Sequence, residues 1–106
     1  MNLNKIHFHD SQIIGVVEYL ETGELLIDID YPIDWQNDIF EHKIIVFRNV
    51  LNYEVHEGPF EGRPTILQVQ QVGRKEERSL LRIETNAGFR QLLCTEVELQ
   101  NPSGLD

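Results

Sequence analysis

The sequence predicts an all-β fold, a single antiparallel sandwich or curled half-barrel of about seven short strands. Apolar and polar side chains alternate along successive segments, turn-forming residues separate these segments, and β-branched residues are frequent. The 106 residues are 41% hydrophobic and 25% charged, which is typical of a folded globular chain. We therefore expect one all-β domain that spans residues 1–106.

The first two strands are expected to form a hairpin. Residues 24–30 place aliphatic side chains on one face and acidic side chains on the other, with Leu26 as the exception. Gly23 allows a turn with positive φ just before them. Residues 12–20 also fit a helical stripe, but their β-branched side chains and the interior Gly15 favour a strand.

The middle of the chain is expected to contain a connection followed by a central strand. A proline and several acidic residues interrupt the alternation over residues 31–42, which we interpret as a connection. Residues 43–50 include a run of consecutive apolar side chains, which indicates a strand buried on both faces. Alternation resumes over residues 51–55, and Asn49 or Asn52 is expected to mark a bulge or tight bend.

The second half of the chain continues the pattern of short strands and turns. Glycines and prolines mark residues 58–64 as a loop. Residues 86–88 are expected to form a three-residue hairpin connection, with Gly88 in a left-handed conformation. The expected strands are 65–72, 79–85 and 89–99, and the tail from about residue 100 to Asp106 is expected to fray.

The net charge excludes some classes of partner. Nine basic and 18 acidic side chains give a formal net charge of −9, with histidine neutral. Such a surface repels a phosphate backbone and an anionic membrane, so we expect neither nucleic acid nor membrane as a partner. A basic protein is favoured electrostatically instead.

The single cysteine and the apolar runs bear on the cellular compartment. Cys94 is the sole cysteine, so an intrachain disulfide is impossible, and we interpret it as a small buried core residue. The first residues contain no apolar stretch typical of a signal peptide, and the longest apolar run is residues 44–47. These observations predict a cytoplasmic protein. Because no catalytic signature or cofactor motif is present, we expect no cofactor and favour a non-enzymatic role.

The densest polar cluster lies near the start of the chain. His7 and His9 share one face of an extended segment, and Asp10 with one of the other two histidines could complete a metal site. The simpler interpretation is that Asp10 and Ser11 form a turn before the first strand, with the histidines half exposed. We favour the turn and keep the metal site as the alternative.

A run of acidic residues encloses the only tryptophan, Trp35. Oxygen-rich clusters can bind Ca²⁺, but the spacing matches no calcium-binding loop, so a solvated face is the better interpretation. Trp35 could anchor a cationic partner or fold back to close one end of the sheet, and we favour closure of the sheet end. The acidic residues are Asp28, Asp30, Asp34, Asp38 and Glu41.

Part of the sequence resembles a known group of proteins. The segments concerned are His9-Asp10-Ser11-Gln12-Ile13, the run from Gly23 to Asp30, and Val46-Phe47 with the residues up to Tyr53. They resemble small bacterial all-β proteins in which a His-Asp-Ser step leads into the first hairpin. Some of that group are thought to be immunity proteins that neutralise bacterial toxins. The resemblance implies a toxin-binding role and brings no catalytic residues.

These observations lead to one preferred function and two alternatives. The preferred function is a non-enzymatic, acidic protein-binding module, and its partner is expected to be a basic protein such as a toxin. The expected contact residues are Asp30, Asp34, Trp35 and Asp38. The alternatives are a metal-binding protein or metal-dependent enzyme that uses His7, His9 and Asp10, and a homodimer or larger homo-oligomer that pairs through an edge strand.

Overall fold

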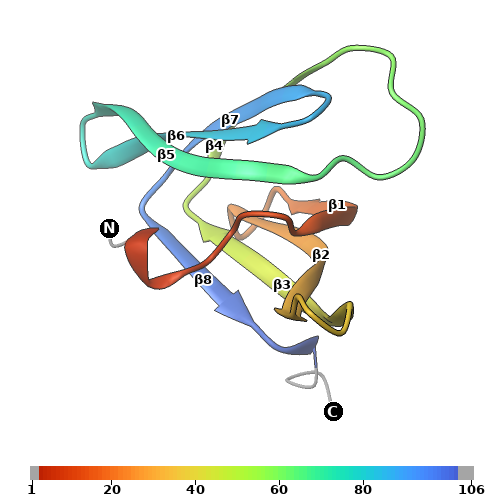
Figure 1. Ribbon diagram of the computed structural model, residues 1–106. Helices are drawn as coiled ribbons and strands as arrows, with labels where there is room; N and C mark the ends of the chain where they lie inside the picture. The colour runs from red at the N-terminus through yellow and green to blue at the C-terminus, as the bar shows by residue number, and fades with distance from the viewer. Residues whose placement is uncertain (1–2, 103–106) are drawn as a thin grey trace.

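The computed structural model describes residues 3–102, with the backbone alone for Asn4, as two four-stranded antiparallel sheets (Figure 1). Sheet A has the strand order β1-β2-β3-β8, and sheet B has the order β5-β6-β7-β4. The expected all-β fold is therefore confirmed. The elements are η1 (Leu3–Lys5), β1 (Gln12–Tyr19), β2 (Glu24–Asp34), β3 (Ile39–Arg48), β4 (Leu51–Glu57), β5 (Ile66–Lys75), β6 (Arg78–Thr85), β7 (Gly88–Cys94) and β8 (Glu96–Gln100).

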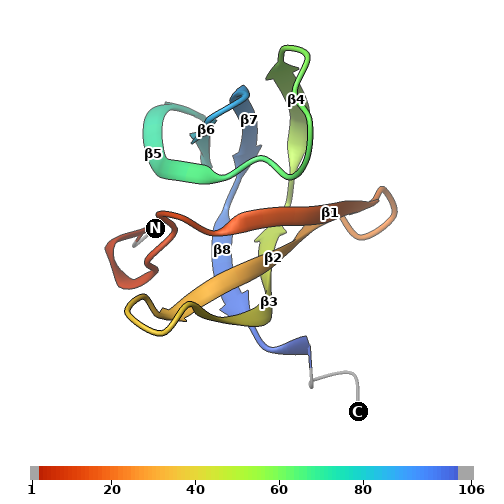
Figure 2. The same ribbon diagram turned by 45° about the vertical axis from the view of Figure 1, so that its right-hand side comes forward.

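The two halves of the chain exchange their last strands. Strands β1 to β3 belong to sheet A, but β4 crosses into sheet B. Strands β5 to β7 belong to sheet B, but β8 crosses into sheet A. The two crossings run side by side (Figure 2), because the Thr95 amide donates to the Arg48 carbonyl at 3.0 Å and the Asn49 side chain donates to the Thr95 hydroxyl at 2.7 Å.

The prediction of one strand over residues 89–99 is wrong. Two strands occupy this segment, which brings the total in the described residues to eight. Strand β7 ends at Cys94, and β8 begins at Glu96 in the other sheet. Apolar residues keep the same spacing on both sides of Thr95. Alternation of apolar and polar side chains indicates which face of a strand is buried, but it does not indicate which sheet the strand joins.

The connection expected at residues 31–42 is also wrong. Strand β2 continues to Asp34 and β3 begins at Ile39, which leaves a turn at residues 35–38. Proline is accepted at position 32 because β1 pairs with β2 only as far as Asp30. Beyond that point β2 has a single neighbour, so the missing amide of the proline breaks no second ladder.

The core lies between the two sheets and is closed along one side. Buried side chains from β2, β3, β6 and β7 meet there, and Phe8 from the N-terminal segment joins them. The start of β1 reaches the start of β5, where the Ile13 amide donates to the Pro64 carbonyl and the Ile66 amide donates to the Ser11 carbonyl, both at 2.8 Å. This seam gives the sandwich the character of a half-barrel.

Several local expectations are confirmed. The segment expected at residues 12–20 is a strand rather than a helix and ends at Tyr19, and the apolar run of β3 is buried at an interior position of sheet A. Gly23 has a φ of +74°. Asn49 and Asn52 both have positive φ, and the register between β4 and β7 shifts at the second of them.

The connection at residues 86–88 and the tail differ in detail from expectation. Gly88 already pairs with Thr85, so the turn contains two residues. The φ of Gly88 is +148°, whereas a left-handed helical conformation has a φ of about +57°.

Gln100 is paired with Ile44, and the Asn101 side chain accepts a hydrogen bond from Lys43, so the chain is ordered to this point. The expected fraying of residues 103–106 lies outside the described residues. Within residues 3–102, no helix is long and apolar enough to cross a membrane.

Candidate functional site

The tip of hairpin β2–β3, residues 33–40, presents aromatic and aliphatic side chains to solvent. Trp35 is 54% exposed, and its ring packs edge-on against Phe40 with the ring centroids 6.4 Å apart. Ile33 and Ile39 are also about half exposed. The tip extends beyond Gln12, the first residue of β1, so β2 has no β1 neighbour there.

The expectation that Trp35 closes one end of the sheet is therefore wrong. The core is filled without it, since Phe8 is 5% exposed and Ile13 is 4% exposed. Sequence composition could not reveal that these smaller groups suffice. A large aromatic side chain that remains in water is the type of residue found at the centre of protein interfaces.

Two carboxylates flank Trp35 at the tip. Asp34 accepts hydrogen bonds from the backbone and side chain of Asn37, at 3.2 and 2.8 Å. The side-chain bond and then the backbone bond lower the pKa of Asp34, so its negative charge persists into mildly acidic solution. Asp38 adopts a positive φ of 57° in the turn. Neither carboxylate forms an ion pair with any residue of the described range 3–102.

Asp30 lies apart from the other expected contact residues. It is on β2 before the tip, and its carboxylate accepts from the Arg63 guanidinium at 2.6 Å. Arg63 belongs to the loop between β4 and β5, so this ion pair joins distant parts of the sequence. The structure thus brings Asp34, Trp35 and Asp38 together, whereas the charge of Asp30 is already paired.

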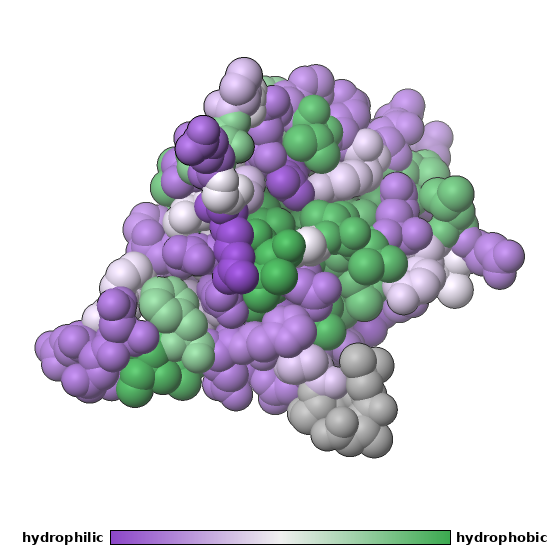
Figure 3. Space-filling view, turned by 90° about the vertical axis from the view of Figure 1, so that its right-hand side faces the viewer, coloured by the Kyte–Doolittle hydropathy of each residue, from purple (hydrophilic) through white to green (hydrophobic). Residues whose placement is uncertain are grey.

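The outer face of sheet A carries an apolar stripe that the sequence analysis did not assign. Because Leu25 and Ile27 point into the core, Leu26 points outward, and it is paired on either side with Val17 and Val46. Figure 3 shows this face, with an apolar patch in its middle and hydrophilic groups around it. The apolar stripe consists of Val17, Leu26, Ile44 and Val46. Val17 is 43% exposed and Leu26 is partly buried, whereas Ile44 and Val46 are buried, at 8% and 3% exposed.

The signals for this stripe were present in the sequence. Leu26 departs from the alternation of its strand, and the apolar run at residues 44–47 leaves no polar side chain for the solvent face. From the sequence alone, Leu26 is an exception without an explanation, and the apolar run indicates burial on both faces of its strand. Only the pairing of β1, β2 and β3 shows that the outward members of the two strands are neighbours.

Charged side chains border the apolar stripe. Arg48 lies 2.6 Å from Glu98, 3.7 Å from Glu96 and 3.8 Å from Glu24. The hydrogen bond from Arg48 lowers the pKa of Glu98, so this carboxylate remains ionised. Asp28 contacts His42 at 3.0 Å on the same face. Carboxylates outnumber cations along this border.

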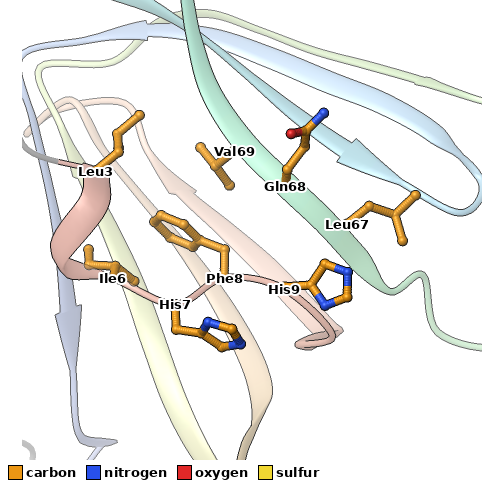
Figure 4. A pocket seen from close by; sticks show the side chains of 8 residues that line it. All are labelled: Leu3, Ile6, His7, Phe8, His9, Leu67, Gln68 and Val69. Carbon is orange, nitrogen blue, oxygen red and sulfur yellow. The ribbon is translucent and has the colours of Figure 1, made fainter.

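The histidine segment forms the expected turn, without the convergence that a metal site requires. His7 and His9 project to one side while Phe8 points to the other side and into the core (Figure 4). The His9 ring contacts the Asp10 carboxylate, and Asp10 has a φ of +72° in the turn. A shallow cavity of about 260 Å³ lies beside the segment, lined also by Leu67.

The remaining histidines are held elsewhere. His42 contacts Asp28, and His56 contacts Glu54 at 2.8 Å while stacking on Phe89. Across residues 3–102, no group of three or more histidine, cysteine, aspartate or glutamate side chains could hold a metal ion. The residues of the metal alternative, His7, His9 and Asp10, therefore stay a cluster with no further ligand in the described part of the chain.

Cys94 is buried as expected. Its side chain is fully shielded from solvent, and burial raises the pKa of its thiol to about 12. A thiol in this environment stays protonated and is a poor nucleophile at neutral pH.

Comparison with known proteins identifies no relative of this chain. No protein-family model, no curated protein and no solved structure matches it.

Proposed function

We propose that this chain is a non-enzymatic protein-binding module whose tip, residues 33–40, binds a basic protein. The observation that carries the proposal is the exposure of Trp35 between two carboxylates that have no cationic partner within residues 3–102. Tryptophan contributes buried area and a ring face that attracts cations, and the neighbouring carboxylates favour lysine and arginine. A basic partner would receive both kinds of contact at one site.

The partner class follows from charge and from the resemblance at the start of the chain. A formal net charge of −9 accelerates encounter with a cationic protein and slows encounter with an anionic one. The resemblance to bacterial immunity proteins supports a toxin as that cationic protein. A cytoplasmic location belongs to the same proposal, because an immunity protein of this kind would protect the cell that makes it.

Affinity capture with matched variants tests the proposal. The full chain is immobilised, host extract is passed over it, and captured proteins are compared for Trp35→Ala, for the double variant Asp34→Asn with Asp38→Asn, and for controls. Phe60→Ala is a suitable aromatic control, because Phe60 is 44% exposed in the loop between β4 and β5. Glu76→Gln with Glu77→Gln is the matched charge control on hairpin β5–β6.

The expected result is one basic protein that is retained by the controls and lost by both tip variants. Loss of a single interface tryptophan typically costs about 2 kcal/mol, or roughly thirtyfold in affinity. Association should also slow as salt is raised, because steering between charged surfaces is screened. Equal capture by the tip variants and the controls would contradict the proposal. Rescue of cells that express the captured protein tests the immunity role directly.

A further inference from the structure

The outer face of sheet A has open space above Gly15, hereafter called the hollow. Gly15 is paired with Asp28, so the hydrogen that would be replaced by a side chain points to the same outward face as the apolar stripe. A Cβ added at Gly15 would meet no heavy atom within 4 Å beyond its chain neighbours. The backbone there has no positive φ that would require glycine. Neither crowding nor backbone conformation therefore demands glycine at this position.

The hollow is continuous with apolar side chains. In the next row of the sheet, Val17 is 43% exposed and pairs with the partly buried Leu26, which pairs with Val46, a residue that is only 3% exposed. Ile14, the residue at the bulge before Gly15, is 44% exposed. The centre of Figure 3 shows the resulting apolar patch. Contiguous apolar surface bordered by polar groups commonly marks an interaction site.

The charges around the stripe determine which occupant fits. Five carboxylates border it, whereas two guanidinium groups, from Arg48 and Arg63, offset them. A second copy of this chain would bring a second acidic border against the first, which like-charge repulsion opposes. A segment with lysine or arginine beside apolar side chains meets both features. The five carboxylates belong to Glu24, Asp28, Asp30, Glu96 and Glu98.

We propose that the accessible part of the apolar stripe, Val17 and Leu26 with the open space at Gly15, is a docking surface, hereafter called the groove, for a cationic amphipathic segment of the protein partner. The apolar side chains of that segment cover Val17 and Leu26, and its cationic side chains reach the carboxylates at the border. This inference rests on the proposed function, because it names the part of the partner that continues from the tip onto sheet A.

The experiment uses a synthetic probe and two matched tryptophan variants. The probe is a short fluorescent peptide in which lysine and leucine alternate, and the reference peptide has serine in place of every leucine. Gly15→Trp fills the hollow. Gly58→Trp is its control, because a Cβ at Gly58 also meets nothing within 4 Å and this residue lies in the loop after β4.

Amide shifts of the isotope-labelled full chain on addition of the lysine–leucine peptide should map to β1, β2, β3 and β8. Gly15→Trp should weaken binding by about tenfold or more, while Gly58→Trp leaves it unchanged. The serine peptide should bind more weakly than the leucine peptide at equal charge. Thermal unfolding verifies that each variant is folded. If Gly15→Trp does not fold, Val17→Arg replaces it, with Val72→Arg as the matched control.

Three outcomes would contradict the proposal that the groove binds the partner. They are equal binding of the two peptides, equal loss in the two tryptophan variants, and a dimer of the chain that Gly15→Trp dissociates. Shifts confined to residues 33–40 would also overturn it, but would leave the proposed function standing. If host-extract capture is lost in Trp35→Ala and retained in Gly15→Trp, the tip binds the partner and the groove does not. If capture is retained in both variants, both proposals fail.

Discussion

Arg90 and Glu57 form a bidentate ion pair between β7 and β4, with both nitrogen–oxygen distances at 2.8 Å. The two side chains are only 10% and 12% exposed. Arg90 pairs across the sheet with the fully buried Ile83, so the ion pair lies on the core-facing side of sheet B. Tyr53 accepts a further hydrogen bond from Arg90 at 3.1 Å, and Thr85 donates to Glu57 at 3.1 Å.

Removal of one member of this pair should be more harmful than removal of both. Arg90→Met leaves a shielded carboxylate without its cation, and we expect a loss of about 3 kcal/mol in the free energy of unfolding. The double variant Arg90→Met with Glu57→Met should recover most of that loss. Urea denaturation of the single and double variants measures the difference. A single variant within about 0.5 kcal/mol of the parent would show that the pair has no net role.

The same pair should make stability depend on acid pH. The hydrogen bond from Arg90 lowers the pKa of Glu57 below its ordinary value of 4.5. The unfolded chain therefore takes up this proton first, and the stabilisation is present above pH 4.5 and is lost as pH falls through the lower, folded-state pKa. Glu57→Gln should flatten the acid limb of a plot of unfolding free energy against pH. Glu77→Gln, at an exposed carboxylate, is the control and should leave the limb steep.

Glycine should be required at position 88 and dispensable at position 15. A Cβ at Gly88 would clash with the carbonyl oxygen of His56, and the φ of +148° is itself unfavourable for other residues. We expect Gly88→Ala to cost about 3 kcal/mol. Gly15→Ala should be neutral or stabilising by about 0.5 kcal/mol. Chemical denaturation of the two variants checks the contrast, and equal effects would contradict this account.

Cys94 should report on unfolding. Burial keeps the thiol protonated, with a pKa of about 12, and shields it from reagents. We expect Ellman's reagent to label the native protein at pH 8 only at the rate at which the structure opens. Labelling should become immediate in urea. Rapid labelling of the native protein would mean that β7 is exposed in solution.

Trp35 should sense the negative charge around it. Because the ring is 54% exposed, neutral acrylamide should quench its fluorescence efficiently. Caesium should quench more strongly than iodide at low salt, since Asp34 and Asp38 attract cations and repel anions. The double variant Asp34→Asn with Asp38→Asn should reduce the difference between the two ions. Equal quenching by caesium and iodide in the parent would contradict an acidic environment.

The sequence predicts the all-β class and most strands because burial is decided locally by alternation. Residues 24–30 and 79–85 have one fully buried face, so a period of two locates them directly. The strand residues within 31–42 are not predictable from the sequence, because Pro32 is tolerated only where β2 has a single neighbour. Strand β1 begins at Gln12, opposite Asp30, and therefore leaves position 32 beside β3 alone.

The candidate site could be predicted only in part for a related reason. Asp34, Trp35 and Asp38 are close in sequence, so a turn was sufficient to bring them together. Arg63 neutralises Asp30 across 33 positions of sequence, and a local pattern contains no information about such a contact. The apolar stripe also depends on pairing between strands, although Leu26 was already visible as an exception to its pattern.

The exchange of β4 and β8 between the sheets has a consequence for cleavage of the chain. A cut in the loop at residues 58–65 would yield one fragment with β1 to β4 and another with β5 to β8. Each fragment would lack the outermost strand of its own sheet and carry an edge strand whose sheet neighbour is on the other piece. The fragments should therefore reassemble with each other in preference to folding alone. That property would make this small domain a natural reporter of proximity when the two pieces are fused to separate proteins.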